Sequence, residues 1–284
     1  MKIAVIGLGL IGGSFAKSLK ALRPDIHFIG SDRSSQNEER ALELQLVDTC
    51  MPLNQAIETA EIILLAIPVD AIATNLPEIL SQIREDQLVI DFGSTKAKIV
   101  NSVAGHPRRS NFLAAHPMAG TEHTGPDAAF TGLFRDKVLI LCDTEETSPE
   151  LLQKAQALFD LLSFQVITME SEAHDKHIAY VSHLSHVSSF MLGLTVLDIE
   201  KDEANIFNMA GSGFQSTVRL AMSSPAMWAP IFIQNKDNVQ EALSQYISQL
   251  QTFQEALLRE DTDKLLDLMT DANRIRKPLD KKRS

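Results

Sequence analysis

The segment 113–125 reads LAAHPMAGTEHTG and closes an apolar run with a histidine and a proline. Proline restricts the preceding residue, His116, to extended backbone, and Gly120 favours a turn, so the composition predicts a strand end followed by a loop. Histidine is also the side chain whose unperturbed pKa lies nearest neutral pH, and loops after strands often carry functional groups. His116 is therefore a candidate general base, although an ordinary turn would have the same composition.

Two other polar positions could share a site with His116. The sequence DFGSTK at 91–96 follows an apolar run and places Ser94 at the carboxyl end of a predicted strand. Open parallel sheets bind ligands at that edge. The sequence GSGFQSTVRL at 211–220 holds Arg219 in an otherwise apolar stretch. Its planar guanidinium fits a carboxylate, although a structural ion pair would explain it as well.

The segment YVSHLSHVSS at 180–189 carries two histidines on a predicted helix. Ser182 and His186 are four positions apart and share a helix face with Ser189, whereas His183 points about 100 degrees away from Ser182. Either this face meets a ligand or its polar groups are satisfied within a helix interface. No carboxylate or cysteine stands at the spacing of a zinc motif, so we expect no metal site.

A glycine-rich loop near the N-terminus reads GLGLIG and sets Gly7, Gly9 and Gly12 in G-x-G-x-x-G spacing. It follows an apolar run, opens a helical pattern and is followed by Asp32 at the end of the second predicted strand, so a dinucleotide site is predicted. Gly7 would permit the turn, Gly9 would admit the pyrophosphate, and Gly12 would let the helix pack on the sheet. The predicted cofactor-binding residues are Gly7, Gly9, Leu10, Ile11, Gly12, Asp32 and Arg33.

Asp32 also bears on the choice of cofactor. Its carboxylate can accept from both ribose hydroxyls of NAD but would repel the extra phosphate of NADP, so NAD is favoured. Arg33 leaves NADP open, because a neighbouring arginine can accommodate that phosphate.

Alternating strands and helices must position these residues. Apolar runs predict strands at 2–6, 26–30, 62–66, 88–91 and 112–115, with helical patterns at 14–22, at 38–46 and after Val69. Such alternation implies crossover connections, so we expect an α/β, Rossmann-type doubly wound and mostly parallel sheet. A strand-like segment at 137–142, a helix at 149–162 and a strand at 165–169 end this region.

The pattern changes near residue 170. Helical stretches follow at 172–197, in pieces over 203–222, at 228–259 and at 263–273, with no convincing strand. We therefore predict a dinucleotide-binding domain at 1–170 and an all-α domain at 171–284. A long helix at 231–258, apolar on much of its surface, suits a dimer core, although the core of a monomer would give the same pattern.

Composition narrows the class of protein. The 284 residues carry a net charge of −11, which argues against nucleic acid or an anionic membrane as the main partner. Cys50 and Cys142 stand in no metal or redox spacing, and the sequence shows neither a cleavable signal pattern nor an apolar run of membrane length. We expect a cytoplasmic protein whose partner is a small molecule.

Together these motifs resemble those of the prephenate and arogenate dehydrogenase family of tyrosine biosynthesis. The matching pieces, in the family's order and over nearly the whole chain, are GLGLIGGS, DFGSTK, HPMAGTEHTG, SHLSH and GSGFQSTVRLAMSSPAMW. The resemblance implies a Rossmann domain and a helical domain that binds substrate and forms a homodimer. It also implies oxidative decarboxylation of prephenate to 4-hydroxyphenylpyruvate with NAD.

The resemblance carries residue roles over position by position. His116 matches the family's catalytic histidine, which takes the proton of the ring C4 hydroxyl as hydride leaves C4. Ser94 matches the serine that helps to orient that hydroxyl. The matches on or near the substrate side are His186, Arg219, Ser182, Thr121 and Glu122. The chemistry fits independently, because removing hydride from a carbinol carbon needs a base of near-neutral pKa.

Four positions depart from the family pattern, and three of them, at 215, 229 and 230, leave the substrate open. Ser185 stands where many relatives have proline, Gln215 replaces a common lysine, and Ala229 with Pro230 replaces a frequent Arg-Asp pair. Arogenate, which has an amine in place of the side-chain ketone, is therefore an alternative to prephenate. A non-catalytic protein that senses NAD is a further alternative, which the joint presence of the matched catalytic and substrate residues argues against.

Overall fold

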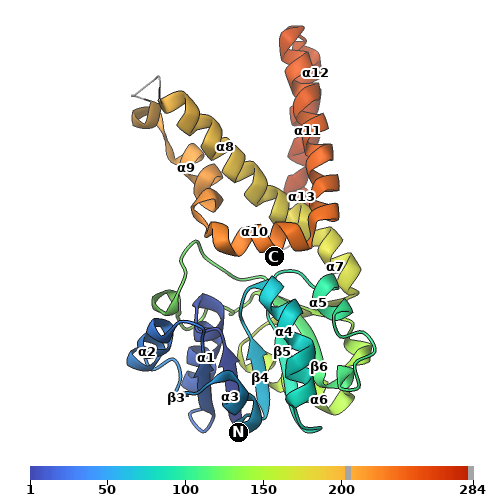
Figure 1. Cartoon of the computed structure of the whole chain (residues 1–284). Coiled ribbons are helices and arrows are strands. Elements are labelled where there is room, and N and C mark those ends of the chain that lie inside the picture. The colour runs from blue at the N-terminus through green and yellow to red at the C-terminus, as the bar shows by residue number, and fades with distance from the viewer. Residues whose placement is uncertain (202–205, 281–284) are drawn as a thin grey trace. The chain divides into compact units, whose positions relative to one another are not determined.

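The computed structural model describes residues 1–201 and 206–280, and within them eight strands form one sheet (Figure 1). The order across the sheet is β3-β2-β1-β4-β5-β6-β7-β8, and every neighbouring pair is parallel except β6 with β7. The strands are β1 (Lys2–Ile6), β2 (His27–Ser31), β3 (Thr49–Cys50), β4 (Ile62–Leu65), β5 (Leu88–Asp91), β6 (Phe112–Pro117), β7 (Val138–Cys142) and β8 (Gln165–Met169). The predicted doubly wound, mostly parallel sheet is confirmed, and its order reverses between β1 and β4, where such sheets bind ligands.

Helices cover both faces of the sheet, because alternate side chains of each strand enter separate cores. In β1, Ile3 and Val5 join one core, while Ala4 and Ile6 join the other. The first core is covered by α1 (Leu10–Leu22), α2 (Ser35–Glu43) and α6 (Pro149–Leu161), and the second by α3 (Leu53–Thr59), α4 (Val69–Gln82) and α5 (Ala97–Asn101). Burial on both faces explains why the central strands read as continuous apolar runs.

The glycine loop between β1 and α1 depends on two close approaches. Gly7 has a φ of +97°, and a Cβ there would clash with the carbonyl oxygen of Ala66. A Cβ at Gly12 would clash with the carbonyl oxygen of Gly7 and lie 2.8 Å from Val5 Cγ1. The tight turn predicted at Gly7 and the close helix packing predicted at Gly12 are both confirmed.

Beyond β8 the chain is helical, but not in the unbroken form predicted for 172–197. Helix α7 (Ser171–Ile178) passes through a π-helical turn at Ala179–His183 into α8 (Leu184–Glu200). A π-turn is wider than an α-turn and so rotates the faces of the helices on its two sides relative to each other. The prediction that Ser189 shares the ligand face is wrong, because its hydroxyl instead donates to Thr217 O and accepts from Ala221 N, each at 3.0 Å.

The continuous helix predicted over 231–258 is also wrong. Helix α10 (Pro225–Gln234) ends before Asn235, whose φ of −104° and ψ of 28° are not helical. The Asn235 amide donates to the carbonyl oxygen of Asp175 at 2.7 Å, which holds this break in place. A new helix, α11 (Lys236–Leu258), starts after it, and α12 (Thr262–Ala272) and α13 (Arg276–Asp280) follow.

The predicted helical pieces over 203–222 begin at positions that lie outside the described residues. From Ile206 onward they comprise a 3-10 turn at Ile206–Met209, α9 (Ser212–Val218) and a second 3-10 turn at Arg219–Met222.

The chain divides into two compact units, Met1–Lys236 and Asp237–Ser284. The first unit extends past residue 170 because Trp228 and Ile231 of α10 pack into one of the two cores of the sheet. The boundary predicted near residue 170 divides a dinucleotide-binding region from an all-α region, and it stays a prediction. None of the helices in the described parts of the chain is long and apolar enough to cross a membrane.

Candidate active site

A cleft of about 670 Å³ opens at the carboxyl edge of the sheet. The loops after β1, β4, β5 and β6 line one side through residues at 9–11, 66–69, 92–94 and 116–125. The π-helical turn, the start of α8, the second 3-10 turn and α10 line the rest. The structure thus brings Ser94, His116 and the glycine loop to one crevice, together with Thr121, Glu122, Ser182, His186 and Arg219.

The start of α1 is built to meet an anion. Gly9, Leu10 and Ile11 line the cleft, and α1 begins at Leu10 without a side-chain cap and without an acidic residue in its first turn. Helix N-termini present unpaired N–H groups and a partial positive charge, which suit a phosphate. A dinucleotide pyrophosphate therefore fits this end of the cleft.

Asp32 lies directly after β2, beside the glycine loop. Its Oδ2 accepts from Leu8 N at 2.9 Å, and its Oδ1 accepts from Ser34 N at 2.9 Å and from Asn37 Nδ2 at 3.1 Å. These donors hold an ionised carboxylate in one orientation, which suits ribose hydroxyls and disfavours a 2′-phosphate. The neighbouring Arg33 is exposed.

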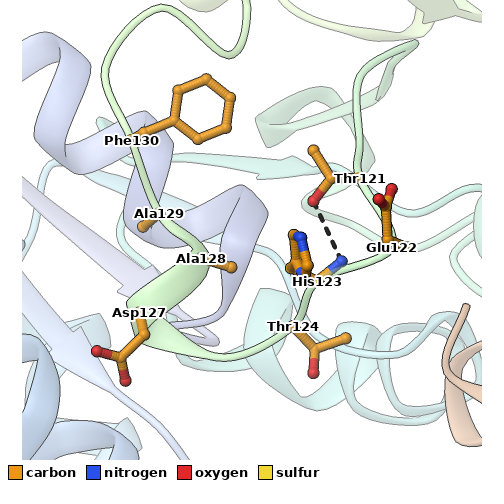
Figure 2. Close-up of a pocket in the computed structure, with 8 residues that line it drawn as sticks. All are labelled: Thr121, Glu122, His123, Thr124, Asp127, Ala128, Ala129 and Phe130. Carbon is orange, nitrogen blue, oxygen red and sulfur yellow. Dashed lines mark hydrogen bonds between the residues drawn. The ribbon is translucent and has the colours of Figure 1, made fainter.

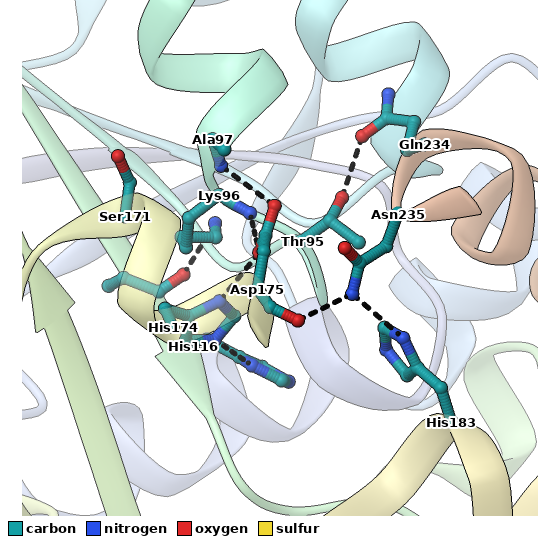
Figure 3. Close-up of polar contacts among 12 residues, drawn as sticks. Thr95, Lys96, Ala97, His116, Ser171, His174, Asp175, His183, Gln234 and Asn235 are labelled. Carbon is teal, nitrogen blue, oxygen red and sulfur yellow. Dashed lines mark hydrogen bonds and ion pairs between the residues drawn. The ribbon is translucent and has the colours of Figure 1, made fainter. Parts of the chain in front are cut away.

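A chain of two histidines and an aspartate sets the protonation of His116 (Figure 3). Asp175 is held as a carboxylate by Lys96 N at 2.8 Å and Ala97 N at 3.0 Å, and it accepts from His174 Nδ1 at 2.8 Å. A carboxylate only accepts, so His174 carries its proton on Nδ1 and accepts through Nε2. His116 Nδ1 lies 2.8 Å from His174 Nε2 and must donate to it. His116 Nε2 is consequently an acceptor.

The surroundings of His116 also keep the ring neutral. The side chain is buried, and burial lowers its pKa well below the usual value, with His174, Lys96 and His183 adding smaller effects in the same direction. The ammonium of Lys96 is itself fully buried, and it donates to Asp91 and, at 2.9 Å, to the carbonyl oxygen of Ala115. A neutral histidine with a free Nε2 can take a proton from a hydroxyl group.

His186 of α8 and Trp228 of α10 line the helical side of the cleft. Their rings stack with centroids 3.5 Å apart, and His186 Nδ1 donates to the carbonyl oxygen of Ser182 at 3.0 Å. Burial lowers the pKa of His186. The neutral ring therefore offers an acceptor at Nε2, whereas the protonated ring would offer a donor.

Arg219 reaches the loop after β6. Its Nη1 lies 3.2 Å from Glu122 Oε2, and the Arg219 side chain is 52% exposed. An exposed ion pair of this kind contributes little stability, so the guanidinium can bind a ligand carboxylate instead. In the same loop, Thr121 Oγ1 accepts from His123 N at 3.2 Å.

The outer side of that loop borders a second pocket, lined by 121–124 and 127–130 (Figure 2). Two contacts tie this part of the loop to helices of the nucleotide-binding region. Phe130 N donates to Ser14 Oγ at 3.1 Å, and Arg40 donates to Asp127 Oδ1 at 2.6 Å and 2.9 Å. The loop is thereby anchored at the far end from His116.

Sequence reasoning missed the residues that orient the base. His174, Asp175 and Asn235 stand in no recognisable motif, and His116 and His174 are 58 positions apart. The prediction that His183 points away from the ligand face is wrong, because it supposes a regular α-helix where the chain forms a π-helical turn. An unusual density of histidines between 174 and 186 is the signal that could have pointed to this region.

Comparison with known proteins agrees with this geometry. The family model for the prephenate dehydrogenase nucleotide-binding domain matches residues 15–168, and the model for the prephenate dehydrogenase dimerization domain matches residues 170–271. The cyclohexadienyl dehydrogenase of Zymomonas mobilis is 30% identical over 276 residues, which span 96% of this chain and 94% of that protein.

Two solved structures are similar over most of their length. The prephenate dehydrogenase of A. aeolicus in complex with hydroxyphenyl propionate and NAD+ superposes with a TM-score of 0.87 at 28% identity, covering 98% of each chain. The arogenate dehydrogenase of Synechocystis superposes with a TM-score of 0.77 at 28% identity, covering 98% of this chain and all of the other.

Proposed function

The chain belongs to the prephenate dehydrogenase family of NAD-dependent enzymes of tyrosine biosynthesis, and we propose that it converts prephenate to 4-hydroxyphenylpyruvate with hydride transfer to NAD+. The observation that carries the proposal is the fixed acceptor at His116 Nε2, which lies in the same cleft as the uncapped start of α1. A proton acceptor beside a dinucleotide is the arrangement that oxidation of a carbinol needs.

The residues around the glycine loop fit NAD. Gly9 leaves room above the backbone, since a Cβ there would have Gly125 N as its nearest neighbour at 3.9 Å. We assign the pyrophosphate to Gly7, Gly9, Leu10, Ile11 and Gly12, and the ribose to Asp32 with Arg33 beside it. When bound, NAD+ supplies the hydride acceptor.

His116 would act as the base on the hydroxyl group at ring C4. Its Nε2 takes the hydroxyl proton as hydride leaves C4, and the His174–Asp175 pair stabilises the positive charge that forms on the ring. Loss of CO2 from C1 then leaves the electron pair of the broken bond to complete the aromatic ring, and the phenolate oxygen takes the proton back from His116 to give the 4-hydroxyphenyl group. Ser94 lines the cleft with His116 and is assigned to orient the hydroxyl group.

The helical wall would hold the carboxylates and side chain of the substrate. Arg219 offers a guanidinium for a carboxylate, with His186 and Ser182 beside it and with Thr121 and Glu122 on the opposing loop. One observation favours arogenate as the second candidate: neutral His186 presents an acceptor, which suits the ammonium of arogenate better than the ketone of prephenate.

The helical part from residue 171 is proposed to form a homodimer. The match to a dimerization domain supports this proposal, as do exposed apolar side chains along α8, namely Met191, Leu194, Leu197 and Ile199. The two family models meet near residue 170, which supports the predicted functional boundary. The cytoplasmic location expected from the sequence stays a prediction.

Formation of NADH tests the proposal. We expect turnover with prephenate and NAD+ to exceed turnover with arogenate or with NADP+. His116→Asn should bind NAD+ normally but lose at least about a hundredfold in turnover, the scale of a lost general base. Measurable NAD+ binding without NADH formation from either substrate would instead support the non-catalytic NAD-sensing alternative.

A further inference from the structure

His183 holds a hydrogen-bond donor that the reaction scheme above does not use. The side chain is fully buried and yet lines the cleft. Its Nε2 is buried as well, and no group within residues 1–201 and 206–280 is hydrogen-bonded to it. A buried polar nitrogen without a partner is unfavourable, which indicates that a ligand completes its bonding.

The contacts of Asn235 determine which nitrogen of His183 carries the proton (Figure 3). The Asn235 Nδ2 donates to the carbonyl oxygen of Asp175 at 2.7 Å, and because a carbonyl oxygen only accepts, the orientation of the amide is defined. The same Nδ2 lies 3.2 Å from His183 Nδ1 and donates its second hydrogen there. His183 Nδ1 is therefore an acceptor, and the proton is on Nε2.

The ring is also neutral and firmly oriented. Burial lowers the pKa of His183 to about 4, so Nε2–H is a neutral donor at physiological pH. The ring packs edge-on against Trp228, with centroids 5.8 Å apart, and against Phe232, with centroids 6.3 Å apart. A donor held in this way costs little further ordering when a ligand arrives.

One residue, Asp175, connects this donor to the base. Its carboxylate orients His174 and through it His116, while its carbonyl oxygen orients Asn235 and through it His183. His183 and His116 line the same cleft. The two cleft-lining rings thus present complementary groups, an acceptor on His116 and a donor on His183.

We propose that His183 is a further catalytic residue, whose Nε2–H donates to the oxygen on the ring carbon from which hydride is removed. The inference rests on the proposed function. As the hydroxyl proton passes to His116, negative charge grows on that oxygen, and a preorganised N–H stabilises it. A hydroxyl group is the natural ligand for this pair, because it donates to His116 and accepts from His183 at the same time.

The substrate carboxylates are the less suitable partners for His183. A carboxylate would favour the protonated ring, whereas the burial of His183 opposes protonation and outweighs the opposite effect of Asp175, with smaller contributions from His174 and His186. Arg219 already provides a charged donor for a carboxylate on the helical wall.

Paired ligands that differ by the hydroxyl group test the assignment. Binding of 3-(4-hydroxyphenyl)propionate and of 3-phenylpropionate would be measured calorimetrically in the presence of NAD+, for the wild-type enzyme and for His183→Leu and His183→Gln. We expect His183→Leu to weaken binding of the hydroxylated ligand by about 3- to 10-fold, the effect of one neutral hydrogen bond, and to leave binding of 3-phenylpropionate unchanged. The amide of His183→Gln can return a donor, so this variant should recover part of the preference for the hydroxyl group.

Turnover gives the second readout. His183→Leu should lower kcat by roughly 100-fold, the scale of a lost donor to a developing oxyanion, with a smaller loss for His183→Gln. His177→Leu is the matched control, because His177 is exposed on the same stretch of helix and does not line the cleft. Its kcat should equal that of the wild type.

Two results would overturn the assignment while leaving the proposed function intact. One is that His183→Leu weakens the binding of both ligands equally. The other is that His183→Leu keeps the wild-type preference for the hydroxylated ligand. In both cases turnover by the wild-type enzyme would be normal. Absence of NADH formation by the wild-type enzyme would instead refute the proposed function, and the role of His183 with it.

Discussion

Replacing Asp175 by asparagine should reverse the tautomers of both His174 and His116. In the native chain, Asp175 Oδ1 accepts from His174 Nδ1 and from Lys96 N, each at 2.8 Å, and Oδ2 accepts from Ala97 N at 3.0 Å. An amide nitrogen in place of Oδ1 would donate to His174 Nδ1, which moves the His174 proton to Nε2. His174 would then donate to His116 Nδ1, and the His116 proton would occupy Nε2, where the base must accept.

The structure also sets the size of the effect. A base whose accepting nitrogen is already protonated loses its function, so we expect kcat to fall by about 10²- to 10⁴-fold. With its nitrogen in place of Oδ1, the new amide leaves the buried backbone N–H of Lys96 without its acceptor. The opposite orientation would leave the N–H of Ala97 without its acceptor and would keep the native tautomers. We expect that loss to lower the free energy of unfolding by about 1–3 kcal/mol.

Steady-state kinetics, NAD+ titration and denaturant unfolding would measure these changes. Asp175→Asn should leave the Kd for NAD+ near the wild-type value, because the start of α1 is untouched, and it should alter the pH profile of kcat/KM as well as its height. Glu172→Gln, at an exposed position of α7, is the matched control and should behave as wild type. If Asp175→Asn kept at least a third of the wild-type kcat while NMR of the ring nitrogens placed the His116 proton on Nε2, the chain of tautomers would not govern catalysis.

Three further predictions follow from the same geometry. Because burial lowers the pKa of His116 in the folded free enzyme, kcat/KM should stay level as pH falls through 6.5 and decline only at lower pH; a decline centred above 6.5 would contradict a desolvated base. Gly12→Ala should lower the free energy of unfolding by about 1–3 kcal/mol and weaken NAD+ binding, because the new Cβ meets the Gly7 carbonyl. Gly213→Ala is the control and should change neither, since no atom lies within 4 Å of its Cβ. Equal melting temperatures for the two variants would refute this prediction. Asp32→Ser should raise the KM for NAD+ by about tenfold and the KM for NADP+ much less. The substitution removes the acceptor for the ribose hydroxyls, but it also removes the charge that repels the 2′-phosphate. An unchanged ratio of the two KM values would show that Asp32 does not select the cofactor.

Short-range patterns in the sequence were sufficient for seven of the eight described strands, all but Thr49–Cys50, and for the edge at which the site forms. The strand Leu88–Asp91 and the strand Gln165–Met169 were predicted with their observed bounds, because a run of apolar residues closed by turn formers defines a buried strand locally. The glycine loop was equally accessible, since the need for glycine at Gly7 and Gly12 follows from backbone sterics over a few positions. The placement of Ser94 and His116 at one edge then follows from parallel pairing.

Long-range packing set the details that determine the chemistry. No local pattern connects His116 with His174. The sequence also does not predict the π-helical turn that brings His183 to the cleft. Nor does it predict the helix break at Asn235, whose side chain places the proton of His183 on Nε2. The break depends on a hydrogen bond from Asn235 to Asp175, sixty positions earlier in the chain. The identity of the base can therefore be recognised from neighbouring residues, whereas its tautomer depends on hydrogen bonds that exist only after distant helices have packed.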